Sequence, residues 1–196
     1  MNKIYYIADM HCGHKNVIKF DLRPFKSIGE MDKALINNWN SVVDSLDDVY
    51  ILGDFCWDKE DRWIEVLKQL KGKKYLILGN HDLKRLTPKV KGYFSGIYDY
   101  REIKDNGRKV ILCHYPIPFY KNDYSPDVYH LYGHIHVTIE NDFMEKIKKM
   151  IQDEDTRDSG KHMCQFYNVG CMMPWMGYTP RTLDEIIEGV RKYDKA

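Results

Sequence analysis

The apolar residues of this chain gather in short, nearly continuous runs. Five of these runs are rich in β-branched and aromatic residues: Ile4–Ala8, Val49–Leu52, Tyr75–Leu78, Val110–Cys113 and Tyr129–Tyr132. Because they are mostly continuous rather than alternating, they predict strands that are buried on both faces, as in a parallel sheet covered by helices.

Helical patterns separate the first three runs. Ser27 and Glu30 have the spacing of a capping box, which predicts a helix that continues to about Leu46. Asp58 is placed to cap a second helix. The apolar stripe of that helix consists of Trp63, Ile64, Leu67 and Leu70. Strands that alternate with helices predict an α/β fold.

The second half of the chain has a different pattern. Tyr98–Lys104 and Arg108–Cys113 flank Asp105-Asn106-Gly107, which is a hairpin signal. A last strand is expected at Gln165–Val169, and Thr182–Glu185 is another capping box before a terminal helix. The inward side chains of that helix would be Leu183, Ile186, Ile187 and Val190.

The segment 137–162 fits neither pattern and is expected to be an inserted helix followed by a mobile loop. Glu140–Gln152 carries apolar residues at helical spacing, and Asp153–Lys161 is polar. The apolar residues are Phe143, Met144, Ile147, Met150 and Ile151. Such a stripe would be buried against the parent domain, in a dimer contact, or as a flap over a cleft.

The composition narrows the class of protein. A length of 196 residues predicts one domain, residues 1–196, and a hydrophobic fraction of 43% is ample for its core. Lys and Arg number 30 against 29 Asp and Glu, so no broad basic field predicts nucleic-acid binding. The chain shows no signal-peptide pattern and no apolar run of membrane-spanning length, so we expect a cytoplasmic protein with no membrane partner.

The five cysteines have no regular spacing, so a disulfide framework is not expected. Cys12, Cys56 and Cys113 lie within two residues of the polar motifs described below. Thiolate ligation of a metal is one interpretation of them. Small apolar filler at the ends of strands is the favoured one.

Short polar motifs follow the apolar runs, and they carry the candidate chemistry. They are Asp9-Met10-His11, Gly53-Asp54, Gly79-Asn80-His81-Asp82, His114 and Gly133-His134-Ile135-His136. In an extended chain, side chains two residues apart point the same way, so Asp9 and His11 can reach one ion, as can His134 and His136. The two oxygens of Asp54 can bridge two ions. Carboxylate, amide oxygen and imidazole together suit Mn, Fe, Zn, Co or Ni.

In this order the motifs resemble those of the calcineurin-like metallophosphoesterase superfamily, and the resemblance spans Asp9 to His136. It implies a four-layer α/β/β/α sandwich with a dinuclear metal site at the strand ends. One ion would be held by Asp9, His11 and His136, and the other by Asn80, His114 and His134, with Asp54 bridging. His81 would contact the phosphate or protonate the leaving oxygen, with Asp82 beside it as an orienting partner.

The function that this resemblance implies is hydrolysis of a small phosphate ester by attack of a metal-bound hydroxide on phosphorus. Two divalent ions would be the cofactors, with Mn the first choice. A phosphodiester, in particular a nucleotide-derived one, is the favoured substrate; a phosphomonoesterase or a nucleotide pyrophosphatase is the alternative. A non-catalytic, metal-stabilised interaction module is the alternative from another class. The intact ligand set favours the enzyme, whereas the stripe Phe143–Ile151 favours a partner surface, such as that of a homodimer.

Other residues near the motifs are candidates for substrate contacts. His14 and Arg23 belong to a segment that resembles small bacterial and phage members of the superfamily, which implies contact with the substrate phosphate. The favoured alternative is that His14 caps the first helix and Arg23 pairs with a surface carboxylate. Tyr115, Phe119 and Tyr120 would stack on a base or an aryl leaving group, or equally pack inward.

Overall fold

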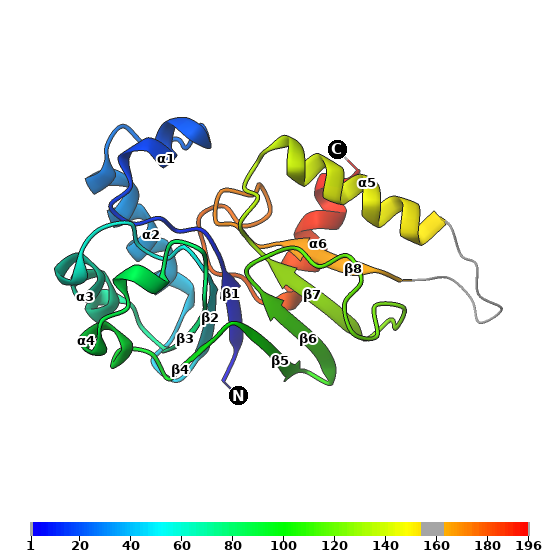
Figure 1. Ribbon diagram of the computed structural model, residues 1–196, viewed down its shortest axis with the longest axis horizontal. Helices are drawn as coiled ribbons and strands as arrows, with labels where there is room; N and C mark the ends of the chain where they lie inside the picture. Colours follow the sequence, from blue (N-terminus) through cyan, green and yellow to red (C-terminus); the bar gives the residue numbers. More distant parts are fainter. Residues whose placement is uncertain (1, 154–162, 196) are drawn as a thin grey trace.

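A computed structural model describes residues 2–153 and 163–195 and contains two four-stranded sheets flanked by helices (Figure 1). In the first sheet the strand order is β1-β2-β3-β4, and all neighbouring strands are parallel. The strands are β1 (Ile4–Ile7), β2 (Asp48–Leu52), β3 (Lys73–Ile77) and β4 (Gly96–Tyr98). Because parallel strands end at the same edge of a sheet, the turns after β1, β2 and β3 lie together.

Helices α1 to α4 lie beside the first sheet, on the left in Figure 1. They are α1 (Lys15–Phe20), α2 (Ile28–Val42), α3 (Glu60–Gln69) and α4 (Pro88–Lys91), with a short 3-10 helix at Leu83–Arg85. Ser27 caps α2 as predicted, since its hydroxyl accepts a hydrogen bond from the Glu30 amide. The helix ends earlier than expected, because the Asp47 carboxylate holds the Asp44 amide in a tight turn.

The predicted cap of α3 is wrong. The helix begins after Lys59, which provides no side-chain cap. The Asp58 carboxylate accepts a hydrogen bond from the amide of the adjacent Lys59 instead. The predicted apolar stripe is nevertheless correct in its main contacts, because Trp63 and Leu67 are fully buried.

In the second sheet the strand order is β5-β6-β7-β8, with β5 and β6 antiparallel and the other pairs parallel. The strands are β5 (Tyr100–Asp105), β6 (Arg108–Cys113), β7 (Val128–Tyr132) and β8 (Gln165–Asn168). The predicted hairpin turn is confirmed, and both Asn106 and Gly107 have positive φ, as its geometry requires. The expected single strand Tyr98–Lys104 is divided at Asp99, where the chain passes from the first sheet to the second.

The two sheets lie between two groups of helices, which gives the expected four-layer α/β/β/α sandwich (Figure 1). Helices α5 (Ile139–Asp153) and α6 (Leu183–Tyr193) lie beside the second sheet, and the capping box at Thr182 is confirmed. Backbone hydrogen bonds join Ala8 after β1 to Val169 and Cys171 after β8. This connection brings the ends of the two sheets together. Within the described ranges, none of the helices is long and apolar enough to cross a membrane.

The predicted helix of the insertion is present as α5 and packs against β8. Met144 is buried, and the Lys148 ammonium lies over the rings of Phe166 and Tyr167. Two residues of the predicted apolar stripe, Phe143 and Met150, are exposed. The buried face of α5 is therefore narrower than the sequence pattern indicates. Of the expected loop Asp153–Lys161, residues 154–161 lie outside the described residues.

Candidate metal centre

The predicted ligands all follow the carboxyl ends of strands and come from both sheets. Three motifs follow β1, β2 and β3 of the first sheet, and two follow β6 and β7 of the second. These ligands are Asp9, His11, Asp54, Asn80, His114, His134 and His136. The hydrogen bond from the His134 amide to the Asp9 carboxylate, 3.0 Å long, directly connects the two halves of the site.

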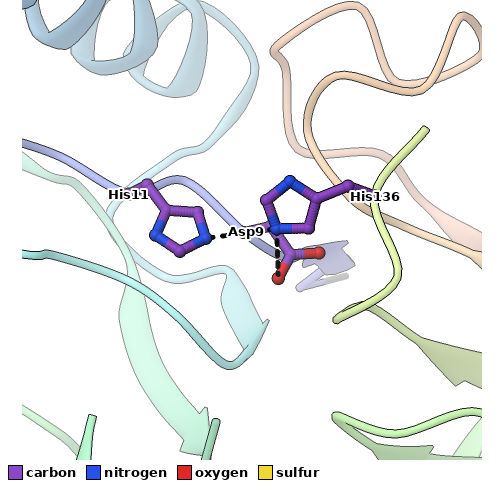
Figure 2. Close-up of side chains that lie close together, drawn as sticks. All are labelled: Asp9, His11 and His136. Carbon is purple, nitrogen blue, oxygen red and sulfur yellow. Dashed lines mark hydrogen bonds and ion pairs between the residues drawn. The ribbon is translucent and has the colours of Figure 1, made fainter. Parts of the chain in front are cut away.

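Asp9, His11 and His136 form the first group of candidate ligands (Figure 2). The Nε2 atoms of His11 and His136 are 3.2 Å apart, and His136 Nε2 is 3.8 Å from Asp9 Oδ1. Burial lowers the pKa of His11 well below its usual value and raises that of Asp9. Two ring nitrogens that face each other beside a buried carboxylate fit a bound cation, which would satisfy all three.

Asn80, His114 and His134 form the second group. The Asn80 Oδ1 atom is 3.1 Å from His114 Nε2 and 3.1 Å from His134 Nδ1. Between the two groups lies Asp54, whose Oδ2 atom is 3.5 Å from His11 Nε2 and 3.8 Å from His114 Nε2. The seven predicted ligands thus lie together, and their oxygen and nitrogen donors fit divalent ions. Which ion each residue holds stays a prediction.

Two of the histidines are fixed by hydrogen bonds on the ring nitrogen that points away from the site. His114 Nδ1 donates to the Leu52 carbonyl at 2.7 Å, and His136 Nδ1 donates to Asp21 Oδ1 at 2.8 Å. Burial alone would lower the pKa of His136, but the bond to Asp21 raises it. Both arrangements turn Nε2 towards the site and leave it as the lone-pair donor, which is how a metal-ligating histidine is oriented when its other ring nitrogen donates to a carbonyl or a carboxylate.

Arg23 does not lie where the resemblance implied, at the surface that would contact the substrate phosphate. It is buried, and its guanidinium donates to the carbonyls of Asp9 and Met10, at 2.8 and 3.0 Å. It also binds the Asp21 carboxylate at 2.8 Å, so it pairs with a mostly buried carboxylate rather than a surface one. The expected contact with substrate phosphate is wrong, because these bonds hold the guanidinium inside the protein. Arg23 instead supports the turn that carries Asp9 and the carboxylate that orients His136.

Asp82 also differs from the expectation that it orients His81. Its two buried oxygens accept hydrogen bonds from the amides of Asp54, Phe55 and Gly79, at 2.9, 3.1 and 2.9 Å. Burial raises its pKa to about 6, although these amides oppose the shift. Asp82 therefore fixes the turns after β2 and β3 relative to each other, and with them Asp54 and Asn80.

His81 lies beside the ligands with its side chain 38% exposed, and its Nε2 is 3.9 Å from Asp54 Oδ2. Its ring contacts Trp57 at a centroid distance of 4.5 Å, and Trp57 stacks on His14 at 4.1 Å. His14 occupies the N-cap position of α1 without a side-chain cap bond, so the expected capping role is wrong. His14, Trp57 and His81 all line the pocket over the candidate ligands. Trp57 was not predicted, and its only sequence signal is an aromatic residue three positions after Asp54.

The backbone around the site is strained, as is common where function fixes side-chain directions. Five of the seven candidate ligands have positive φ, namely Asp9, His11, Asp54, His134 and His136. The preceding glycines leave room for neighbouring ligands. A Cβ on Gly53 would lie 2.3 Å from His114 Nδ1, and one on Gly133 would lie 2.6 Å from Asp9 Oδ2.

The cysteines near the motifs behave as apolar filler. Burial raises the pKa of Cys12 well above its usual value, raises that of Cys56 to about 12, and raises that of Cys113. In the described part of the chain, the clusters of His, Cys, Asp or Glu side chains that could hold an ion are Asp9-His11-His136 and Asp9-Asp54-His114, and neither contains a cysteine. These findings support the favoured interpretation over thiolate ligation.

Comparison with known proteins agrees with this geometry. The family model of calcineurin-like phosphoesterases matches residues 2–162. The uncharacterized protein MJ1445 of Methanocaldococcus jannaschii is 37% identical over 153 residues, which cover 77% of this chain and 80% of that protein. The gene 66 protein of Mycobacterium phage L5 is 36% identical over 86 residues, 42% of this chain and 41% of that protein.

A solved structure has the same fold along almost the whole chain. It is that of the protein of unknown function AQ665 from Aquifex aeolicus, with a TM-score of 0.62 and 26% sequence identity, and the match covers 96% of this chain and 99% of that one. The family model covers well over half of the present chain, and the strand ends carry the grouped Asp and His side chains that a metal-dependent enzyme needs. The chain therefore belongs to the calcineurin-like phosphoesterase family, whose members are metal-dependent hydrolases of phosphate esters.

Proposed function

We propose that this protein is a phosphodiesterase that works with two divalent ions, with Mn as the first choice, on a small phosphate diester. The position of Asp54 is the observation that carries the proposal. One of its oxygens lies within 3.8 Å of a ring nitrogen in each of the two ligand groups. A carboxylate in that position is suited to bridge two ions. Two such ions, when bound, lower the pKa of a shared water and neutralise charge on a phosphoryl oxygen.

The protein's own residues supply orientation and a proton. Asp21 and the Leu52 carbonyl fix the rings of His136 and His114, so the site needs little rearrangement when it is loaded. His81 lies beside the ligands with its side chain 38% exposed, a position that suits a group touching the substrate. In the proposed reaction, His81 donates a hydrogen bond to the phosphoryl group and protonates the leaving oxygen.

The walls of the pocket favour a diester over the monoester and pyrophosphate alternatives. The pocket is lined by His11, His14, Val17, Phe20, Asp54, Trp57, Asn80, His81, His134 and His136. Among these described residues there is no Lys or Arg, so only the ions and the histidines would balance substrate charge. A diester carries a single negative charge, whereas a monoester or a pyrophosphate carries more and would need further cations.

Turnover of paired substrates tests the proposal. The kcat/KM for a nitrophenyl diester and for the matching nitrophenyl monoester are compared with Mn, with chelator, and in a His81→Ala variant. We expect Mn-dependent hydrolysis with a preference for the diester. A preference for the monoester would contradict the diesterase assignment and leave the two-ion site intact. No metal-dependent turnover of either would favour the interaction module, with the exposed Phe143 and Met150 as its partner surface.

A further inference from the structure

The pocket has one distinctly apolar side, formed by α1 and the turn after β2. It consists of His14, Val17, Phe20 and Trp57, which we call the α1 wall. Val17 is buried and forms the base, while Phe20 is 74% exposed at the rim. The Phe20 ring meets His14 edge-on at 6.4 Å, and His14 stacks on Trp57. A large exposed aromatic ring beside a pocket marks a surface that a ligand can cover.

The α1 wall lies on the same side of the site as His81. The Trp57 ring contacts both His14 of the wall and the His81 ring. Arg85 strengthens this arrangement, because its guanidinium lies over the Trp57 ring at 4.7 Å and donates to the His81 carbonyl at 2.7 Å. His81, which protonates the leaving oxygen in the proposed reaction, therefore borders the α1 wall.

The segment after His114, which the sequence suggested for aromatic stacking, does not form this surface. Tyr120 is buried against the His130 ring, so it packs inward. Tyr115 contacts His134, on the side of the second ligand group. Phe119 is 74% exposed, like Phe20, but it is not among the residues that line the pocket.

We propose that the α1 wall is the leaving-group subsite, and that it selects a flat aromatic leaving group, such as an aryl group or a nucleoside base, over a small alkyl group. This inference rests on the proposed diesterase function, because it assigns His81 to the leaving oxygen. Aromatic groups gain from stacking on rings and from the apolar area that they bury there.

Two diesters with leaving groups of similar acidity but different ring area test the subsite. Methyl phenyl phosphate and methyl 2-naphthyl phosphate are hydrolysed by the Mn-loaded wild type, by Phe20→Ala and by Phe119→Ala. Phe119→Ala is a matched control, because it removes an equally exposed ring outside the pocket. We expect the wild type and Phe119→Ala to prefer the naphthyl ester by about tenfold in kcat/KM, and Phe20→Ala to lose most of that preference.

A binding measurement separates failure of the subsite from failure of the proposed function. Calorimetry compares 2-naphthylphosphonate with methylphosphonate, neither of which is hydrolysed, on the same three metal-loaded proteins. Tighter binding of the naphthyl compound that depends on Phe20 supports the subsite. If this binding is found but neither ester is hydrolysed, only the diesterase proposal fails. Turnover with no naphthyl preference, or the same loss in both variants, would overturn the subsite and leave the diesterase proposal standing.

Discussion

At the scale of single residues, the metal centre depends on side chains that do not themselves reach an ion. Asp21 accepts the Nδ1 proton of His136 and is held in turn by Arg23. Replacing Asp21 with Asn should weaken metal binding by about 10- to 100-fold, the usual cost of losing such a partner. Competition with a metal-sensitive dye measures the affinity. Asp58→Asn is the control, because the Asp58 carboxylate accepts a hydrogen bond from the adjacent Lys59 amide and is not one of the candidate ligands.

His81 is expected to behave in the opposite way. It lies beside the ligands without belonging to either group, so His81→Ala should keep the metal content of the wild type. Turnover should fall by about 10²–10⁴-fold, the range for a positioned acid–base group. Metal analysis and kinetics on the same preparation check both halves of this prediction. Loss of metal together with activity would make His81 a ligand and require new roles for its neighbours.

The residues that could be predicted from the sequence are those whose chemistry shows in their type and spacing. Asp9-Met10-His11 and Gly133-His134-Ile135-His136 indicate ligands through the residue types that they place directly after buried strands. The expected extended backbone was wrong, because all four ligand residues have positive φ, and His134 and His136 lie in different ligand groups. Asp21 and Trp57 could not be predicted, because their role depends on contacts with His136 and His81, which lie far away in the sequence. The prediction for Arg23 failed for the same reason, because no local pattern distinguishes a buried guanidinium from one that faces substrate.

At the scale of elements, the variants of α5 test directly which face of the helix packs against the second sheet. Met144 is buried against the second sheet, whereas its neighbour Phe143 is 51% exposed. Met144→Ala should lower the free energy of unfolding by about 2–4 kcal/mol through lost burial and the cavity left behind. Phe143→Ala should change the free energy of unfolding by less than about 1 kcal/mol. Urea unfolding of both variants checks this, and equal effects would mean that α5 packs on a different face.

The bounds of helices and strands could be predicted where a single local sequence signal determines them. The capping boxes at Ser27 and Thr182 mark helix starts because their hydroxyls bond backbone amides three residues away. The break at Asp99 was not predictable, since Tyr98 and Tyr100 both suit a strand and only the three-dimensional structure assigns them to different sheets. The end of α2 depended on a side-chain bond from Asp47 that the helical pattern does not show.

At the scale of the whole molecule, stability should depend on pH through His130, a buried residue of β7 that packs against Tyr120 and Tyr132 and is not one of the candidate ligands. Its Nδ1 donates to the Ile111 carbonyl, and its Nε2 accepts from the Ile117 amide, so the buried ring is neutral. Burial lowers its pKa to about 4. The unfolded chain, with a His pKa of about 6.5, therefore binds more protons between these values, and stability falls as the pH decreases through that window.

The free energy of unfolding should fall by about 3 kcal/mol between pH 6.5 and 4 because of His130. Below the folded-state pKa of His130, this residue should cause no further loss. Urea unfolding at a series of pH values, compared between the wild type and His130→Gln, isolates the contribution, because the histidines of the metal site are common to both. The variant should be less stable near neutral pH and should lose less stability on acidification. Parallel pH curves for the two proteins would contradict this account.

The whole-molecule arrangement also explains why the site spans so much of the sequence. Asp9 and Asp54 follow strands of the first sheet, whereas His114 and His136 follow strands of the second. The sandwich brings these strand ends together through the bonds between Ala8 and the segment after β8. The sequence indicated which residues could bind metal, but their grouping into two sets around Asp54 depends on how the two sheets meet.

The central claim is that this arrangement holds two ions joined by Asp54. The most direct test is a crystal structure of the Mn-loaded protein with anomalous scattering data, together with elemental analysis of the same sample. We predict two Mn per chain, one beside each ligand group, with an Asp54 oxygen in contact with both. A fully loaded protein with a single ion, or with Asp54 remote from either ion, would contradict the account.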